Sequence, residues 1–258
     1  MEARPKVALV TGSSGGIGRA IAKRLAQEGM SVAIVARVDA RYPATPQDAV
    51  DEIRAMGGIA APFECDLSVP EERAELVARV EKELGPVDVL VNNAAVSTFE
   101  RVAQFRPSRL NLMLEVQVRA VFELSQAVLP AMTANGRGWI FNITSMAAVP
   151  PPVPLPPGGS LNTVYGMCKA AVERLSVGMA AESYADGIDV NALAPTHIVP
   201  TFGAGAFFDL GDRPQENADD IANALAHLIR PLDSRVTGKV LYSQDVLATA
   251  GIDPAAVA

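Results

Sequence analysis

Short runs of apolar residues alternate along this chain with longer segments whose apolar residues recur at helical spacing. Continuous apolar runs are typical of strands that are buried on both faces of a parallel sheet. A continuous run of this kind occurs at 7–10, and mainly apolar runs occur at 31–36, 62–65, 87–91, 139–143, 188–192 and 240–242. The helical patterns cover about 19–28, 46–56, 68–84, 107–133, 165–185 and 218–230. This alternation predicts an α/β fold with a doubly wound parallel sheet of about seven strands.

The pattern predicts a single domain that spans 1–258. A chain of 258 residues could hold two domains, but no linker separates two complete patterns. Two stretches, near 146–162 and 196–214, break the alternation. The first holds a proline-rich run over 150–157 that suits neither a helix nor a central strand. The second includes an apolar, glycine-containing segment, 198–210, that resembles a mobile lid. We expect both stretches to be substrate loops.

Polar residues mark the beginnings of two predicted helices. Thr45-Pro46-Gln47-Asp48 combines an N-cap, a proline at the first helical position and an acid in the first turn. Ser68-Val69-Pro70-Glu71 has the spacing of a capping box. We therefore expect side-chain caps at both helix starts.

A glycine-rich turn, Thr11-Gly12-Ser13-Ser14-Gly15-Gly16-Ile17-Gly18, joins the first strand to the first helix. Glycines let the backbone turn tightly and approach a pyrophosphate, which then faces the free N–H groups and positive end of the helix. This order predicts a Rossmann-type dinucleotide site. The alternative is a glycine-rich loop without a function.

The end of the second strand bears on the choice of dinucleotide. A carboxylate there binds the ribose 2'-hydroxyl of NAD, whereas a basic residue accommodates the 2'-phosphate of NADP. This strand ends in Arg37, and no carboxylate follows until Asp39. We expect NADP as the preferred cofactor, with NAD possible. The alternative is a solvated Arg37.

A tyrosine and a lysine, Tyr165 and Lys169, lie four residues apart on one predicted helix, and therefore on the same face. A cation about 4 Å from a phenol stabilises the phenolate. We expect Lys169 to lower the pKa of Tyr165 and Tyr165 to act as a general acid/base. Without further context, such a pair is more often a surface residue with a solvated neighbour.

Four motifs in one order, Thr11-Gly12 to Gly18, Asn92-Asn93-Ala94, Ser145, and Tyr165 with Lys169, resemble the short-chain dehydrogenases/reductases from Lys6 to about Asp245. The resemblance implies NADP(H)-dependent interconversion of a secondary alcohol and a ketone. Tyr165 would transfer the proton, Ser145 would bind the carbonyl oxygen and Lys169 the nicotinamide ribose. Asp66 would hold the adenine, and Asn92 would shape the cofactor floor. The implied cofactor-binding residues are Gly12, Ser14, Gly16, Ile17, Gly18, Arg37, Asp66, Leu67, Asn93, Ala94, Tyr165, Lys169, Pro195, Thr196 and Ile198.

The sequence departs from this family at several positions. Similar sequences place an asparagine of the proton relay where this chain has Gln117, so Gln117 is a fourth candidate catalytic residue. Tyr165 follows Ser145 by 20 positions, whereas the family usually has about a dozen residues between the two. The surplus is the proline-rich run, and it makes Thr144 a rival to Ser145. Ala95 and Thr196 stand where the family usually has glycine.

Composition limits the partners. A net charge of -7 and a pI near 5.0 argue against nucleic-acid and anionic-membrane partners. The two cysteines, Cys65 and Cys168, and the two histidines form no metal-binding spacing, so we expect no metal. No apolar run reaches transmembrane length, and we expect a cytoplasmic protein.

The substrate half of the site is expected to be apolar, because 149–161 and 198–210 would frame it. A hydrophobic alcohol or ketone is therefore the expected substrate, and related enzymes suggest a homodimer or homotetramer. One alternative is a non-catalytic dinucleotide-binding or regulatory protein. Another, less favoured, makes the proline-rich run a ligand for a partner protein.

Overall fold

Seven parallel strands form one sheet in the computed structural model, which describes residues 6–39, 44–156, 159–201, 213–230 and 235–252. Their order is β3-β2-β1-β4-β5-β6-β7. This order confirms the predicted doubly wound sheet, because the chain runs outward from β1 in both directions. The strands are β1 (Val7–Thr11), β2 (Ser31–Ala36), β3 (Ile59–Glu64), β4 (Val87–Asn92), β5 (Gly138–Ile143), β6 (Ile188–Ala194) and β7 (Val240–Tyr242).

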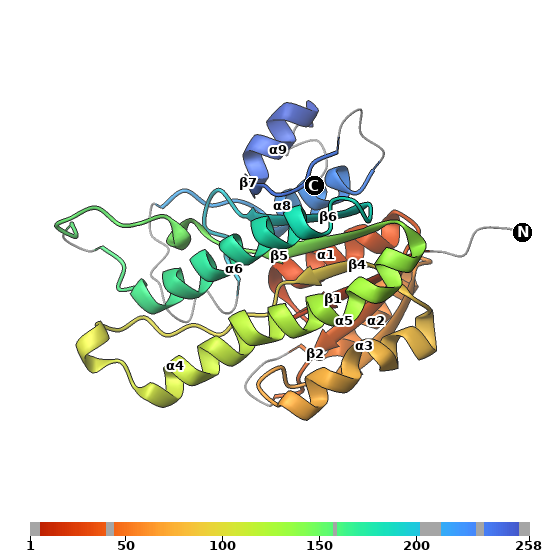
Figure 1. Ribbon diagram of the computed structural model, residues 1–258, viewed down its shortest axis with the longest axis horizontal. Helices are drawn as coiled ribbons and strands as arrows, with labels where there is room; N and C mark the ends of the chain where they lie inside the picture. Colours follow the sequence, from red (N-terminus) through yellow and green to blue (C-terminus); the bar gives the residue numbers. More distant parts are fainter. Residues whose placement is uncertain (1–5, 40–43, 157–158, 202–212, 231–234, 253–258) are drawn as a thin grey trace, which may run out of the picture.

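Helices cover both faces of the sheet. Alternate residues of a strand point to opposite faces, so in β1 Ala8 packs into one core and Leu9 into the other. The first core is closed by α1 (Gly16–Gln27), α2 (Pro46–Ala55), α8 (Ala218–Leu228) and α9 (Ser243–Ala250). The second is closed by α3 (Pro70–Leu84), α5 (Ala120–Asn135) and α6 (Thr163–Glu182), which cross one face of the sheet in Figure 1.

The long middle helix is interrupted. The helical pattern predicted over 107–133 is confirmed, but the segment is not one continuous α-helix: α4 (Pro107–Leu114) passes through a π-helical turn, η2 (Glu115–Arg119), into α5. Such a turn inserts an extra residue into the helical ladder and often occurs at functional sites. This turn contains Gln117. The spacing of apolar residues did not reveal the turn, because the helices on both sides of it keep their apolar faces.

The third strand begins three residues earlier than the sequence pattern predicts, at Ile59. Its Pro62 lies opposite Ile34 of β2. The strand tolerates a proline because β3 forms the edge of the sheet. The apolar run over 62–65 therefore marked only the second half of this strand.

The two helix starts differ in their caps. The predicted cap at Thr45 is confirmed, because its hydroxyl accepts from the Asp48 N–H at 3.3 Å and the Asp48 carboxylate accepts from the Thr45 N–H at 2.7 Å. The capping box at Ser68 is wrong. Val69 is the N-cap of α3, and the Ser68 hydroxyl instead donates to Asp66 at 2.7 Å.

Two short 3-10 turns, η1 (Val102–Gln104) and η3 (Met146–Ala148), lie in loops beside the carboxyl ends of the strands. The proline-rich run contains no helix or strand over 150–156, as predicted. The proposed lid over 198–210 lies mainly outside the described residues, which end at Thr201 and resume at Arg213. Among the described helices, none combines the length and the apolar character required to cross a membrane.

Candidate active site

The carboxyl ends of the strands open into a cleft of about 1080 Å³. The strand order reverses between β1 and β4, because β2 and β3 lie on one side of β1 and β4 to β7 on the other. Ligands of such sheets bind at this point of reversal, and the cleft lies beside it. The structure brings together in this cleft most of the residues that the sequence singled out. They are Gly12, Ser14, Gly16, Ile17, Arg37, Asp66, Leu67, Asn93, Ala94, Ser145, Tyr165, Lys169, Pro195, Thr196 and Ile198. Gly18 and Gln117 are not among the cleft-lining residues.

The glycine turn offers backbone N–H groups to the cleft. Gly12 and Gly16 have φ angles of 65° and 53°, a left-handed conformation that side chains disfavour. Helix α1 begins at Gly16 without a side-chain cap and without an acid in its first turn. Its first N–H groups and positive end are therefore available to an anionic group such as a pyrophosphate.

Gly18 lies behind this turn, where it has a packing role. A Cβ on Gly18 would lie 2.4 Å from the Gly12 carbonyl oxygen and 2.5 Å from the Asn93 side-chain nitrogen. That nitrogen donates to the carbonyl oxygens of Thr11 and Gly12 at 2.9 and 3.2 Å. Asn93 therefore fixes the glycine turn from beneath, and only a glycine at position 18 leaves room for it.

Replacing Gly18 by alanine is expected to lower the free energy of unfolding by about 2 kcal/mol, because a rigid backbone and a bonded amide have to move. Urea unfolding measures this change, and calorimetry with NADP+ measures the accompanying loss of cofactor affinity. Gly178→Ala is the matched control. A Cβ there meets only the flexible end of Arg174, so alanine should leave the helix as stable or more stable. Equal effects of the two substitutions would refute the packing role.

Asn92 lies under the cleft. It is 4% exposed and does not line the cleft, so it would shape the cofactor floor only from beneath. Its amide donates to Asn142 at 2.8 Å, Asn142 donates to Ser176 at 2.9 Å, and Ser176 donates to the carbonyl of Val172 at 2.7 Å. This buried chain of hydrogen bonds ties β4 and β5 to α6, the helix that carries Tyr165 and Lys169.

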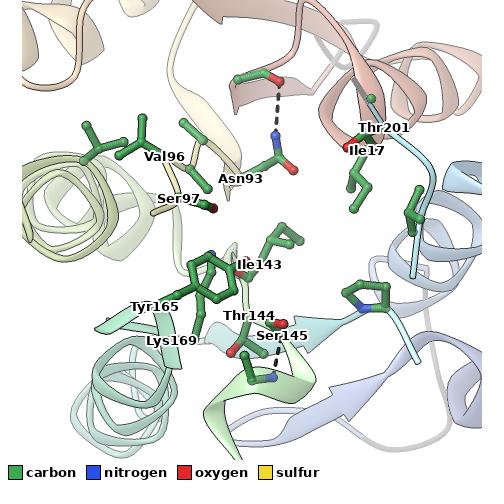
Figure 2. A pocket seen from close by; sticks show the side chains of 18 of the residues that line it. Ile17, Asn93, Val96, Ser97, Ile143, Thr144, Ser145, Tyr165, Lys169 and Thr201 are labelled. Atoms are coloured by element: carbon green, nitrogen blue, oxygen red, sulfur yellow. Dashed lines mark hydrogen bonds between the residues drawn. The ribbon is translucent and has the colours of Figure 1, made fainter. Parts of the chain in front are cut away.

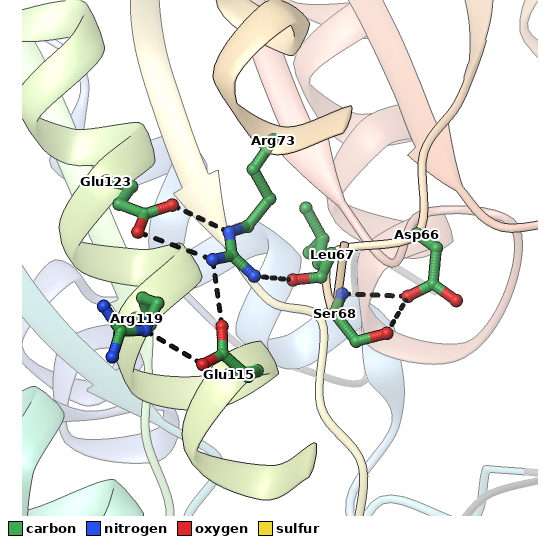
Figure 3. A network of polar contacts seen from close by, with 7 residues as sticks. All are labelled: Asp66, Leu67, Ser68, Arg73, Glu115, Arg119 and Glu123. Atoms are coloured by element: carbon green, nitrogen blue, oxygen red, sulfur yellow. Dashed lines mark hydrogen bonds and ion pairs between the residues drawn. The ribbon is translucent and has the colours of Figure 1, made fainter. Parts of the chain in front are cut away.

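Arg37 follows β2 and lines the end of the cleft that lies beside β2 and β3. Its guanidinium pairs with Asp39 at 3.1 Å and approaches Asp66 at 3.9 Å. One third of the Arg37 side chain is exposed. Asp66 also accepts from the backbone N–H and the hydroxyl of Ser68 (Figure 3).

The structure distinguishes Ser145 from its rival Thr144, as Figure 2 shows. Thr144 is 2% exposed, and its hydroxyl donates to Glu173 at 2.8 Å. The Ser145 oxygen accepts from the Ala147 N–H at 3.2 Å, and the Ser145 side chain lies close enough to Tyr165 to lower the pKa of its phenol. Ser145 is therefore the hydroxyl available beside the phenol.

Tyr165 and Lys169 share one face of α6, one turn apart, as predicted (Figure 2). The Lys169 nitrogen lies 5.5 Å from the centre of the Tyr165 ring. It donates to the backbone carbonyl of Ile143 at 2.8 Å, and the residue is 4% exposed. The lysine is thus held beneath the ring by the end of β5.

Burial, rather than charge attraction, dominates the proton affinities of this pair. It raises the pKa of Tyr165 to about 12, although the hydrogen bond with Ser145 acts in the opposite direction. It lowers the pKa of Lys169 to about 8. The expectation that Lys169 lowers the pKa of Tyr165 is therefore wrong for this structure. Tyr165 is a neutral phenol at physiological pH.

Gln117 braces a wall of the cleft. Its amide nitrogen donates to the carbonyl oxygen of Val96 at 2.8 Å, and the residue is 1% exposed. Its amide oxygen is buried without a hydrogen-bond partner among the described residues. The side chain thus holds the segment after β4, where Phe99 contacts the Tyr165 ring with centroids 5.7 Å apart. Phe99 escaped the sequence analysis, although an aromatic residue soon after the Asn-Asn-Ala motif was the available signal.

Thr196 is fixed by a buried acid that the sequence analysis did not identify. The Glu216 carboxylate accepts from the N–H groups of Thr196 and His197, each at 3.1 Å. The Ser243 hydroxyl donates to the same carboxylate at 2.7 Å. This bonding orients the loop after β6 at the rim of the cleft. Within the described residues, no group of three or more His, Cys, Asp or Glu side chains could hold a metal ion.

Comparison with known proteins agrees with this geometry. The family model described as short chain dehydrogenase matches residues 6–207. A short chain dehydrogenase of Pseudocercospora fijiensis is 37% identical over 202 residues, 77% of this chain and 62% of that relative. The 3-oxoacyl-[acyl-carrier-protein] reductase FabG of Staphylococcus epidermidis is 32% identical over 92% of this chain and 96% of its own length.

A solved structure shares the whole architecture. The short chain dehydrogenase of Burkholderia cenocepacia, in complex with NADP, has a TM-score of 0.80 and 31% identity over 93% of this chain and 96% of its own. The glycine turn, the Ser145, Tyr165 and Lys169 cluster and these matches lead to one conclusion. The chain belongs to the short-chain dehydrogenase/reductase family and is an NAD(P)-dependent oxidoreductase.

Proposed function

We propose that this protein interconverts a secondary alcohol and a ketone and prefers NADP(H). The observation that carries the proposal is the cluster of Ser145, Tyr165 and Lys169, which shares one cleft with a glycine turn able to receive a pyrophosphate. A panel of ketones with NADPH, followed at 340 nm, tests it. The alternative, a non-catalytic dinucleotide-binding protein, predicts cofactor binding without turnover of any ketone or alcohol.

The cluster supports a simple division of labour. NADP(H), when bound, supplies or accepts the hydride. Tyr165, held as a phenol, donates a proton to the carbonyl oxygen during reduction. The Ser145 oxygen already accepts from the Ala147 N–H, and its hydroxyl proton would turn from the phenol to stabilise the same carbonyl oxygen. Lys169 adds positive charge beneath the phenol and would bind the nicotinamide ribose.

The residues present fit a phosphorylated dinucleotide. Gly12 and Gly16 leave the turn open, and the uncapped start of α1 faces the cleft. Arg37 would exchange Asp39 for the 2'-phosphate, and the NADP in the Burkholderia relative supports this assignment. Asp66 and Leu67 would contact the adenine, and Asn93 to Ala94, Pro195 and Ile198 the remainder of the cofactor.

Arg37→Gln is expected to lower kcat/KM with NADPH by about tenfold to a hundredfold, because a charge-assisted bond to the phosphate is lost. Values with NADH should change less than threefold. Arg54→Gln is the control: it alters a cation on α2 that donates to the Ala60 carbonyl of β3, and it should leave the ratio of kcat/KM with NADPH to kcat/KM with NADH unchanged. A wild-type preference for NADH would overturn the role of Arg37.

The substrate half supports a hydrophobic ketone or alcohol. Its lining includes Val96, Phe99, Leu112, Val116 and Met146. Gln117 stays a candidate for the proton relay, since its unpartnered amide oxygen could accept from a water.

Assembly into a homodimer or homotetramer is also proposed, through α5 and α6. Their outer faces expose Phe122, Met167 and Val177 by 40% or more. Light scattering of the purified protein tests the assembly. A cytoplasmic location is proposed on the acidic, cysteine-poor composition, and cell fractionation tests it.

A further inference from the structure

The lining of the cleft is positively charged although the chain is acidic. Among its described residues, the cations are Arg37, Arg109, Lys169 and Arg213, and the only carboxylate is that of Asp66. Four positive charges and one negative give +3, whereas the whole chain carries -7. Part of this positive charge suits an anionic dinucleotide, because Arg37 and Lys169 lie at proposed cofactor contacts. Arg109 does not belong to that part of the site.

Arg109 lies on the wall of the substrate half. It shares α4 and the following turn with Leu112 and Val116, which also line the cleft. These positions, three and seven residues after Arg109, line the same cleft as Arg109 does. Figure 1 shows α4 projecting beyond the sheet beside the start of α6, which carries Tyr165, and away from α2 and β2. A substrate that extends from Tyr165 along this wall would pass Val116 and Leu112 before it reaches Arg109.

The fold itself gives Arg109 no partner. Its side chain is exposed and has no hydrogen bond or ion pair with any residue that the structure describes. The position also disfavours a cation, because Arg109 lies in the first turn of α4, where the helix dipole is positive. A stabilising role in the helix therefore does not account for an arginine here.

We infer that Arg109 binds a carboxylate of the substrate, so that the substrate is an apolar ketone or alcohol with an anionic end. The inference rests on the proposed function. Arg109 and Val116 are seven residues apart, which corresponds to about 10 Å along a helix. We take Val116 as the end of this wall nearest the reacting carbon, so the carboxylate should lie about 10 Å from that carbon. A guanidinium can bind it through two parallel N–H groups.

The test compares 9-oxodecanoate with its methyl ester. In both molecules a chain of eight bonds, about 10 Å when extended, separates the ketone from the terminal group. The wild-type enzyme should prefer the acid by about tenfold in kcat/KM, mainly through KM, as expected for one partly exposed charged contact. The preference should shrink in 1 M KCl, because salt screens exposed charges.

Arg109→Met should reduce the acid-to-ester ratio to about one, Arg109→Lys should retain part of the preference, and Arg109→Glu should reverse it. Arg106→Met is the matched control, because Arg106 is exposed on the same turn but does not line the cleft. It should leave activity and ratio unchanged. A wild-type ratio near one, or a ratio that survives Arg109→Met, would overturn the inference.

Calorimetry with NADP+-loaded protein makes the same comparison without turnover. Tighter binding of the acid than of the ester, lost in Arg109→Met, supports the inference even if neither compound is reduced. Equal binding overturns it. Failure of the proposed function is recognised separately, as the absence of NADPH-dependent reduction across the whole ketone panel.

Discussion

Replacing Tyr165 by phenylalanine is expected to lower kcat about 10³-fold, within the range that a positioned general acid contributes. The substitution removes only the hydroxyl beside Ser145 and leaves the ring against Phe99. Affinity for NADP+ should change less than threefold. Stopped-flow absorbance of NADPH with the best ketone of the panel, and calorimetry with NADP+, measure the two quantities.

Tyr184→Phe is the control for this substitution. Tyr184 follows α6 directly, is 57% exposed and lies under the Arg235 guanidinium, away from the cleft. The control should keep full activity. If Tyr165→Phe also turned over ketone at the wild-type rate, the phenol would not be the proton donor, and a different acid would have to be sought.

Replacing Lys169 by methionine is expected to abolish activity and yet stabilise the ligand-free fold near neutral pH. Burial lowers the pKa of this lysine from 10.5 to about 8, which corresponds to roughly 3 kcal/mol of cost for the charged form. Loss of the hydrogen bond to the Ile143 carbonyl offsets about 1 kcal/mol. The net gain of about 2 kcal/mol should raise Tm by about 5 °C at pH 7.

The difference in the free energy of unfolding between Lys169→Met and the wild type should depend on pH. Below pH 8 the lysine is charged in the folded and the unfolded state, and the folded state bears the full cost of burial. Between pH 8 and 10.5 the folded state loses the proton first, so the wild-type free energy of unfolding rises relative to the variant. The advantage of Lys169→Met should therefore disappear above about pH 10.

Urea unfolding of both proteins at pH 7 and pH 10 measures the difference. Lys82→Met, which changes an exposed lysine in the last turn of α3, is the control and should show no such trend. A variant that is less stable than the wild type at pH 7 would show that the buried ammonium stabilises the fold, contrary to this account.

Local patterns in the sequence were sufficient for the architecture. Short, mainly apolar runs identified all seven strands, because both faces of this sheet are covered by helices. The predicted ends of strands and helices were wrong where contacts with distant parts of the chain determine them. Pro62 continues β3 only because that strand is an edge, and the cap expected at Ser68 was lost because Asp66 binds its hydroxyl more directly.

The members of the site could be named from sequence, but their physical states could not. The spacing of Tyr165 and Lys169 placed them on one face correctly. Their pKa values depend on how much protein surrounds each group, which no spacing encodes. Gln117 likewise matched a motif position, whereas its bond to the Val96 carbonyl depends on the π-helical turn.

The central claim is that burial keeps Tyr165 a proton-carrying phenol beside Lys169. The chain has four tyrosines, so carbon-13 labelling at the tyrosine Cζ gives few NMR signals, and Tyr165→Phe assigns the relevant one. A pH titration of the ligand-free protein should leave the Tyr165 signal at the phenol position beyond pH 11. Conversion to the phenolate below pH 9 would contradict the claim, because charge from Lys169 would then outweigh burial.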